Sequence, residues 1–229
     1  MGSGVRLLVL GKQGAGKGTQ AVRIAEHFGA PHISTGDMFR AAVAAGTPFG
    51  LKAEKFMKRG ELVPDDVVIG VVAERLAKDD AIDNGFILDG FPRTRVQAEE
   101  LQRLLGPGGL DAAVDIDVPT GIVLDRISGR RVCRNCGATY HVNAPPRTDW
   151  KCDKDGGDVV QRDDDKPESV QRRLELYEQD TRPVLEFYDG LNLLATIDGV
   201  GDPDDIFGRI LDGLASVGRS PLSAPPAPQ

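Results

Sequence analysis

Gly11-Lys12-Gln13-Gly14-Ala15-Gly16-Lys17-Gly18-Thr19 is the stretch that decides the fold. An apolar run, Val5 to Leu10, precedes it, and a helical pattern of apolar residues follows it. Strand, glycine-rich turn and helix form the context of a phosphate-binding loop. The glycines let backbone N–H groups point at one anion, the helix adds the positive end of its dipole, and Lys17 supplies a mobile charge. The strict pattern has Ser or Thr directly after the lysine, whereas here Gly18 precedes Thr19, as in the GKGT variant.

Strands and helices alternate along the chain, which predicts an α/β fold with a parallel sheet covered on both faces. The predicted strands are 5–10, 85–90, 113–118 and 193–197, and the predicted helices are 16–28, 37–45, 49–58, 65–76, 95–105, 120–128, a long one from 167 that Pro183 interrupts, and 206–214. Such sheets bind ligands beyond the carboxyl ends of their strands. Gly11, Asp89, Pro119 and Asp198 follow predicted strands, and we expect them to converge on one crevice.

The composition is that of an ordinary soluble domain. The chain has 229 residues, a net charge of −7, 40% hydrophobic residues and 28% charged residues. An acidic chain is a poor general binder of nucleic acid, so we expect no nucleic-acid partner. We also expect no membrane span and no signal peptide, because the apolar runs are too short. Residues 220–229 contain four prolines with alanine and serine, and this composition predicts a disordered tail.

The three cysteines are clustered, and their spacing is typical of a metal site. Cys133-x₂-Cys136 and Cys152-x₂-Asp155 form two knuckles, whose sulfur and carboxylate ligands suit tetrahedral zinc. We predict a closed, structural site in a polar, loop-rich segment. His141 is a rival fourth ligand with a less suitable spacing, and three free thiols are the alternative. Metal ligation rather than a disulfide framework favours a reducing compartment, here the cytoplasm.

Arginines form the second informative group. Six of them lie in or near predicted loops, insertions or helix starts: Arg40, Arg93, Arg126, Arg130, Arg162 and Arg173. One surface arginine is usually only a solvated charge. Near a phosphate-binding loop the group suits a ligand with several phosphates, because guanidinium grips phosphate with a planar fork and keeps its proton. Phosphoryl transfer is catalysed by positioning and electrostatics, so arginines without an evident general base predict transfer to a phosphate acceptor.

Asp89 follows a predicted buried strand, as a Walker-B-type aspartate does. In that position a carboxylate holds Mg²⁺, here through water. The alternative is a cap of a turn or helix. We interpret Asp89 as the magnesium-associated residue because of the phosphate-binding loop.

Several stretches together resemble adenylate kinase. They are Gly14-Ala15-Gly16-Lys17-Gly18-Thr19, Ile33-Ser34-Thr35-Gly36-Asp37-Met38, Leu88-Asp89-Gly90-Phe91-Pro92-Arg93-Thr94, Gly129-Arg130-Arg131 and the Arg162-x-Asp-Asp stretch. The resemblance extends to about Leu214, and the knuckles resemble those of bacterial members with a zinc-binding LID. It implies a P-loop NTPase-type sheet flanked by helices as the CORE (1–33, 64–128 and 166–219). It also implies a small helical AMP-binding insertion (34–63) and a metal-stapled LID insertion (129–165).

The resemblance implies the reaction and a role for each matching residue. The reaction is reversible, direct in-line transfer between ATP and AMP to give ADP, with Mg²⁺, by a monomer. Lys17, Arg130, Arg162 and Arg173 would be catalytic. ATP would contact Gly14, Ala15, Gly16, Lys17, Gly18, Thr19, Arg126, Arg130, Thr139, Tyr140 and Gly201. AMP would contact Thr35, Arg40, Glu61, Leu62, Val63, Gly90, Phe91, Pro92, Arg93, Gln97, Arg162 and Arg173. Asp164 would pair with LID arginines on closure.

Other functions stay open at this point. Another nucleoside monophosphate kinase is the nearest, since the choice of base depends on few contacts. An ATP-dependent regulatory switch is a second alternative, which would need no monophosphate. A zinc-ribbon nucleic-acid module over 133–155 is a third, and the acidic residues there argue against it.

Overall fold

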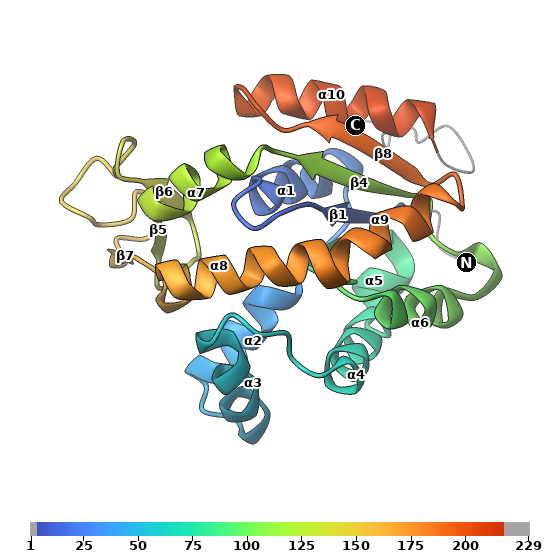
Figure 1. Cartoon of the computed structure of the whole chain (residues 1–229), viewed down its shortest axis with the longest axis horizontal. Coiled ribbons are helices and arrows are strands. Elements are labelled where there is room, and N and C mark those ends of the chain that lie inside the picture. The colour runs from blue at the N-terminus through green and yellow to red at the C-terminus, as the bar shows by residue number, and fades with distance from the viewer. Residues whose placement is uncertain (1–3, 218–229) are drawn as a thin grey trace.

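A parallel sheet of five strands forms the centre of the molecule (Figure 1). The computed structural model describes residues 4–217, so the predicted disorder of 220–229 lies outside the described residues. The strands are β1 (Arg6–Leu10), β2 (His32–Ser34), β3 (Phe86–Asp89), β4 (Ala112–Asp117) and β8 (Leu194–Asp198). Their order is β2-β3-β1-β4-β8, and every neighbouring pair is parallel. The predicted α/β fold is confirmed.

Helices cover both faces of this sheet (Figure 1). They are α1 (Lys17–Phe28), α2 (Thr35–Ala44), α3 (Pro48–Lys58), α4 (Asp65–Leu76), α5 (Asp79–Asn84), α6 (Arg95–Leu105), α7 (Thr120–Gly129), α8 (Pro167–Leu176), α9 (Arg182–Asp189) and α10 (Pro203–Ser216). Side chains alternate along a strand. Leu7 and Val9 of β1 therefore join one buried layer with α1 and α10, and Leu8 and Leu10 join the other with α4, α6 and α9.

Two segments project from this core (Figure 1). One consists of α2 and α3, which pack against each other. The other contains a small antiparallel sheet of β5 (Arg130–Cys133), β6 (Thr139–His141) and β7 (Val159–Val160), in the order β6-β5-β7. The sequence predicted only loop here. Its strands are two to four residues long, which is too short for a hydrophobic alternation to be visible.

Three further details differ from or refine the predicted elements. Residues 32–34 form a short strand and residues 79–84 a short helix, and neither was predicted. The predicted interruption near Pro183 is confirmed, as a π-helical turn, η3 (Tyr177–Thr181), between α8 and α9. A proline has no N–H to donate to the carbonyl four residues earlier, so the backbone widens there. Such wide turns recur at functional sites, and Thr181 of η3 donates to the backbone carbonyl of Arg93 at 2.9 Å.

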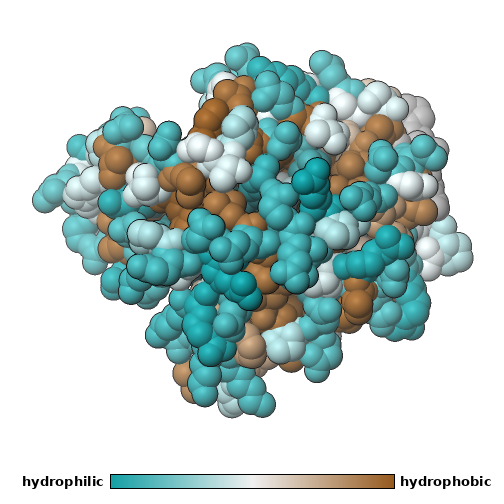
Figure 2. Space-filling view, in the orientation of Figure 1, coloured by the Kyte–Doolittle hydropathy of each residue, from teal (hydrophilic) through white to brown (hydrophobic). Residues whose placement is uncertain are grey.

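Hydrophilic side chains predominate on the face shown in Figure 2, with hydrophobic residues in patches between them. Within residues 4–217, every helix is too short or too polar to cross a lipid bilayer.

Candidate active site

The loop between β1 and α1 has the geometry of an anion cradle. Gly11, Gly14 and Gly16 have positive φ angles of 132°, 82° and 96°, which side chains other than glycine's rarely permit. A Cβ atom on Gly14 would approach Cγ1 of Ile127 to 2.7 Å. The α1 helix begins at Lys17, so its free backbone N–H groups face the loop. The predicted phosphate-binding loop therefore has both the curl and the helix terminus that it needs.

Lys17 lies folded into this loop. Its Nζ donates to the carbonyl oxygens of Gly11 and Lys12, each at 2.8 Å. Burial lowers the pKa of Lys17 to about 8, and the nearby Asp89 carboxylate opposes that shift. Arg93, Arg130 and Arg173 lower it further. These three arginines therefore lie within electrostatic reach of the loop lysine, and a polyanion in this space would neutralise the excess of positive charge.

Predicted arginines from separate segments surround one space. Burial lowers the pKa of Arg162 and of Arg173 to about 10, and it also lowers the pKa of Arg93. The charges of Arg40 and Arg130 act on Arg162 in the same direction. Nε of Arg162 is buried without a hydrogen-bond partner. Several desolvated cations close together constitute a binding site for a highly charged anion.

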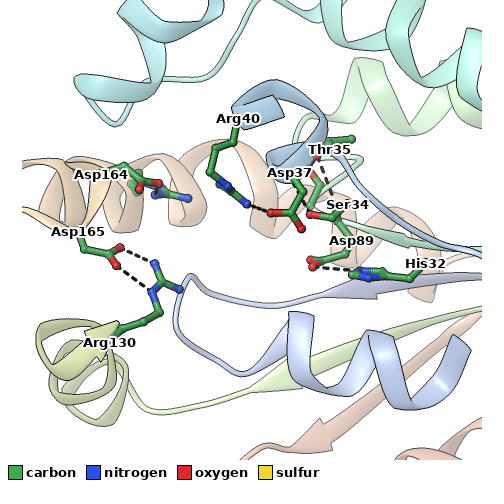
Figure 3. Close-up of polar contacts among 11 residues, drawn as sticks. His32, Ser34, Thr35, Asp37, Arg40, Asp89, Arg130, Asp164 and Asp165 are labelled. Atoms are coloured by element: carbon green, nitrogen blue, oxygen red, sulfur yellow. Dashed lines mark hydrogen bonds and ion pairs between the residues drawn. The ribbon is translucent and has the colours of Figure 1, made fainter. Parts of the chain in front are cut away.

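Carboxylates hold three of these arginines (Figure 3). Asp37 pairs with Arg40 within α2. The side chain of Asp165 is fully buried and accepts hydrogen bonds from Nε and Nη2 of Arg130, and Nε lies 2.8 Å from Oδ2. Oδ2 of Asp164 accepts from Arg173 at 2.5 Å. Only Arg130 is contacted through two of its nitrogens, and in all three pairs the guanidinium could bind a phosphate in place of the carboxylate.

Asp164 is predicted to pair with arginines of the LID insertion on closure. Asp164 bonds Arg173 on α8, outside the predicted LID insertion, and its neighbour Asp165 holds Arg130, which lies within that predicted insertion. Both lie in a single 3-10 turn, η2 (Asp163–Asp165), where successive side chains point in different directions. Gln13 of the phosphate-binding loop also donates to Asp165, at 3.2 Å. Sequence reasoning missed the role of Asp165, since neighbouring aspartates are indistinguishable until the turn is known.

Asp89 ends β3 beside the phosphate-binding loop. Its Oδ2 lies 3.6 Å from Nε2 of His32, which ends up next to it because β2 and β3 are paired (Figure 3). A Cβ on Gly18, in the first turn of α1, would be 3.6 Å from the same oxygen. The carboxylate thus faces the start of α1, where the phosphates of a nucleotide would lie. His32 was not predicted, and a lone histidine in a short strand gives little signal.

A pocket lies between the α2–α3 insertion and the sheet. Most of the residues that the resemblance assigned to AMP line this pocket. The full set of lining residues is Thr35, Gly36, Phe39, Arg40, Met57, Gly60, Glu61, Leu62, Val63, Val68, Gly90, Arg93, Gln97, Asp164 and Arg173. Oγ1 of Thr35 donates to the Gly90 carbonyl at 2.9 Å, and Nε of Arg93 donates to the same carbonyl at 2.7 Å. Phe91 and Pro92 shape the turn, with a cis peptide bond between them. Phe91 is fully buried, so its side chain belongs to the core.

The remaining residues assigned to ATP are more dispersed. Arg126 donates to the carbonyls of Ala15 in the loop and Gly199 after β8, at 3.3 and 3.1 Å. It thereby joins the loop to the turn that contains Gly201. Thr139 and Tyr140 lie on β6. The Tyr140 hydroxyl donates to Sγ of Cys152 at 3.4 Å, so that side chain belongs to the cysteine cluster.

The four predicted metal ligands form a compact cluster. The ligand atoms of Cys133, Cys136, Cys152 and Asp155 all lie within 4.8 Å of one another. Sγ of Cys136 and Sγ of Cys152 are 3.6 Å apart, close to the separation of about 3.8 Å that tetrahedral Zn–S bonds of about 2.3 Å require. Backbone N–H groups of Asn135 and Lys154 donate to the sulfurs of Cys133 and Cys152, each at 3.4 Å. The donor set fits a closed zinc site. His141 lies outside the cluster and accepts from a backbone N–H instead.

A phosphate-binding loop at the carboxyl end of the central strand of a parallel sheet, near an arginine-rich pocket, defines a P-loop phosphotransferase that binds nucleotides. The family description "Adenylate kinase" matches residues 9–192. The adenylate kinase of Bacillus subtilis is 49% identical over 216 residues, which cover 93% of this chain and 99% of the relative. That of Listeria monocytogenes is 51% identical over 215 residues, covering 93% and 100%. That of Syntrophobacter fumaroxidans is 52% identical over 209 residues, covering 90% and 98%. The chain belongs to the adenylate kinase family.

Proposed function

We propose that this chain transfers the terminal phosphoryl group of ATP directly to AMP, reversibly, to give two molecules of ADP. One observation supports the proposal. Arg93 and Arg173 line the pocket beneath α2 and also lie within electrostatic reach of the loop lysine, Lys17. A site for one nucleotide would need only the loop. A second set of cations leading into a second pocket suits a second phosphate-bearing ligand.

On the donor side, the backbone of residues 14–19 cradles the phosphates of ATP. Lys17 exchanges its two carbonyl partners for phosphate oxygens, which restores the charge that burial weakens. Arg126 fixes the loop against the turn containing Gly201, and the backbone of Thr139 and Tyr140 approaches the nucleotide from the LID insertion.

On the acceptor side, AMP occupies the pocket lined by Thr35, Arg93 and Gln97. Arg40 and Arg93 hold its phosphate, and the backbone of residues 61–63 borders its base. A nucleoside monophosphate is already ionised at neutral pH, so no general base is required. This agrees with the cationic character of the site.

Between the two nucleotides, Arg130, Arg162 and Arg173 stabilise the migrating group. In-line transfer spreads negative charge over that group, and preorganised cations lower its energy without having to reorient. Before the nucleotides bind, Asp164 pairs with Arg173 and Asp165 pairs with Arg130. In the complex, nucleotide phosphates replace these carboxylates as partners of the two arginines.

Asp89 would hold Mg²⁺ through water, and this role is supported by the position of its Oδ2, which faces the start of α1. When bound with ATP, the ion neutralises phosphate charge and orients the chain of phosphates.

The cysteine cluster would hold zinc as a structural staple. The small sheet β6-β5-β7 has few buried apolar side chains, namely Val132 and Val159 with Cys133 and Cys152. A metal bound there contributes folding energy that this core alone does not supply. We place the protein in the cytoplasm, where thiols stay reduced.

We assign residues 34–63 and 129–165 as insertions that close over AMP and ATP, on a CORE of 1–33, 64–128 and 166–219. Closure excludes water, which protects ATP from hydrolysis. We also propose that the protein acts as a monomer.

A coupled assay of ADP formation tests this function. AMP-dependent ADP formation with Mg²⁺ is expected, with little activity when the metal is chelated. Parallel rates with CMP, UMP and GMP identify the accepted base. Equal rates with all four would reject the assignment to AMP, and ATP hydrolysis independent of any monophosphate would reject phosphoryl transfer to a nucleotide.

A further inference from the structure

The amide of Gln97 is held at both ends. Its Oε1 accepts the backbone N–H of Arg93 at 2.7 Å. Its Nε2 donates to Oδ1 of Asp65 at 2.7 Å. The second oxygen of Asp65 accepts from the Thr94 hydroxyl at 3.1 Å. Gln97 is only 2% exposed, so water does not compete for these bonds.

These contacts leave only one orientation for the amide. A carboxylate accepts hydrogen bonds and donates none, and a backbone N–H only donates. Rotating the amide by half a turn would set its carbonyl against Asp65 and its NH₂ against the N–H of Arg93. Both contacts would become repulsive, and a buried unpaired polar group is costly. Asp65 is the first residue of α4, where the helix dipole favours a negative charge.

Gln97 is one of the residues that line the pocket, whereas Asp65 is not among them. One N–H and one lone pair of the amide remain for a ligand. Their order in space is set by the two contacts just described. A planar base that pairs with the amide must therefore present an acceptor and a donor in one particular order.

We infer that Asp65 is a positioning residue for base selectivity, which acts through Gln97. Holding the amide in one orientation favours the adenine edge, where N1 accepts and the 6-amino group donates. The edge of hypoxanthine has the reverse order, because N1–H donates and O6 accepts. It would pair with the amide only after the half-turn that Asp65 and Arg93 oppose. This inference rests on the proposed function, with AMP in this pocket and its base at Gln97.

The substitution Asp65→Asn removes one of the two contacts that fix the orientation of the Gln97 amide. An asparagine at position 65 can rotate and present either its NH₂ or its carbonyl to Gln97. The reversed orientation then loses only the contact with the Arg93 N–H. We expect the preference for AMP over IMP to fall about tenfold, the usual effect of one hydrogen bond to a charged group.

The test compares kcat/KM for AMP and for IMP, with ATP as donor, in the wild type, Asp65→Asn and Asp65→Ala. Asp66→Asn is the matched control, since it removes the same charge from the next, exposed residue of α4. The ratio of the two substrates is measured on one sample, so a partly unfolded variant does not distort it. If Asp65→Asn does not fold, Asp65→Ala carries the same expectation.

The expected result is an AMP-to-IMP ratio about tenfold lower in the Asp65 variants, mostly through KM, with kcat at saturating AMP retained and Asp66→Asn unchanged. An unchanged ratio in folded Asp65 variants, or an equal fall in Asp66→Asn, would overturn the inference. Failure of the wild type to use AMP at all would instead reject the proposed function.

Discussion

Arg173 gives the sharpest prediction, because its structural and catalytic contributions can be separated. It bonds Asp164 at 2.5 Å, and the two side chains are only 21% and 12% exposed. Burial alone would raise the pKa of Asp164, but Arg173 and the neighbouring arginines outweigh it and lower that pKa. Replacing Arg173 with Met leaves the carboxylate buried without its main partner.

The size of the stability loss follows from that burial. Removing one partner of a buried ion pair costs about 3–5 kcal/mol, and partial exposure places this pair near the lower value. For a chain of this length, about 3 kcal/mol corresponds to a fall of about 6–12 °C in Tm. Removing a preorganised cation from the transferring group should lower kcat by about 10²–10³. Arg173→Met should therefore show both defects.

The double variant Arg173→Met with Asp164→Asn separates them. It removes the stranded charge, so Tm should recover by more than half of the loss. It does not restore the cation, so kcat should stay low. The measurements are thermal unfolding followed by circular dichroism, and initial rates of ADP formation at 25 °C. Recovery of kcat to within about tenfold of the wild type would refute a catalytic role, because the arginine would then act only by balancing Asp164.

Three further predictions concern charge and metal. The pKa of Lys17 is about 8 in the folded chain and about 10.5 when unfolded, so the affinity for ATP should weaken about tenfold per pH unit above pH 8. Between pH 8 and pH 10.5 the unfolded chain holds this proton and the folded chain does not, so Lys17 itself makes folding stability rise with pH. Calorimetric titrations from pH 7 to 9.5 measure the ATP affinity, and an affinity that does not change with pH would contradict the role of Lys17. Burial raises the pKa of Asp115 to about 6, and its Oδ1 has no hydrogen-bond partner, so this residue makes folding stability fall as the pH rises from about 4 to about 6. Asp115→Asn removes the buried charge and should raise Tm at pH 7 by about 2–6 °C. A lower Tm for this variant would show that the charge is needed. Removing metal with a chelator should lower Tm while leaving the initial rate at 25 °C nearly unchanged, whereas an immediate and equal loss of rate would indicate a catalytic metal.

Much of this fold was predictable because its signals are local. The loop from Gly11 to Thr19 contains its own glycines and lysine, and it lies between a five-residue strand and a twelve-residue helix. The strands β1 and β3 are nearly continuous apolar runs, as buried parallel strands are. The grouping of Cys133 with Cys136 and of Cys152 with Asp155 was predictable from spacing, since each short knuckle brings two possible ligands together.

The elements that were missed depend on tertiary contacts. β2 has three residues and is a strand only because β3 pairs with it. The strands around the cysteine cluster are equally short. No local pattern distinguishes such segments from loop.

The partners of the site residues were the least predictable part. Asp165 rather than Asp164 holds Arg130 because of one 3-10 turn. Asp65 meets Gln97 across 32 positions of sequence. Such pairs follow from how α4, α6 and the second sheet pack on the central one, and single-residue chemistry does not encode that packing.

Transfer of a labelled phosphoryl group in a single turnover tests the central claim most directly. Enzyme in excess is mixed with ATP labelled with ³²P in its terminal phosphate, with and without AMP, and stopped within one turnover. If the loop lysine and the arginines hold two nucleotides end to end, the label passes into ADP only when AMP is present, and little inorganic phosphate forms. Label that appears as inorganic phosphate at the same rate with or without AMP would contradict the account.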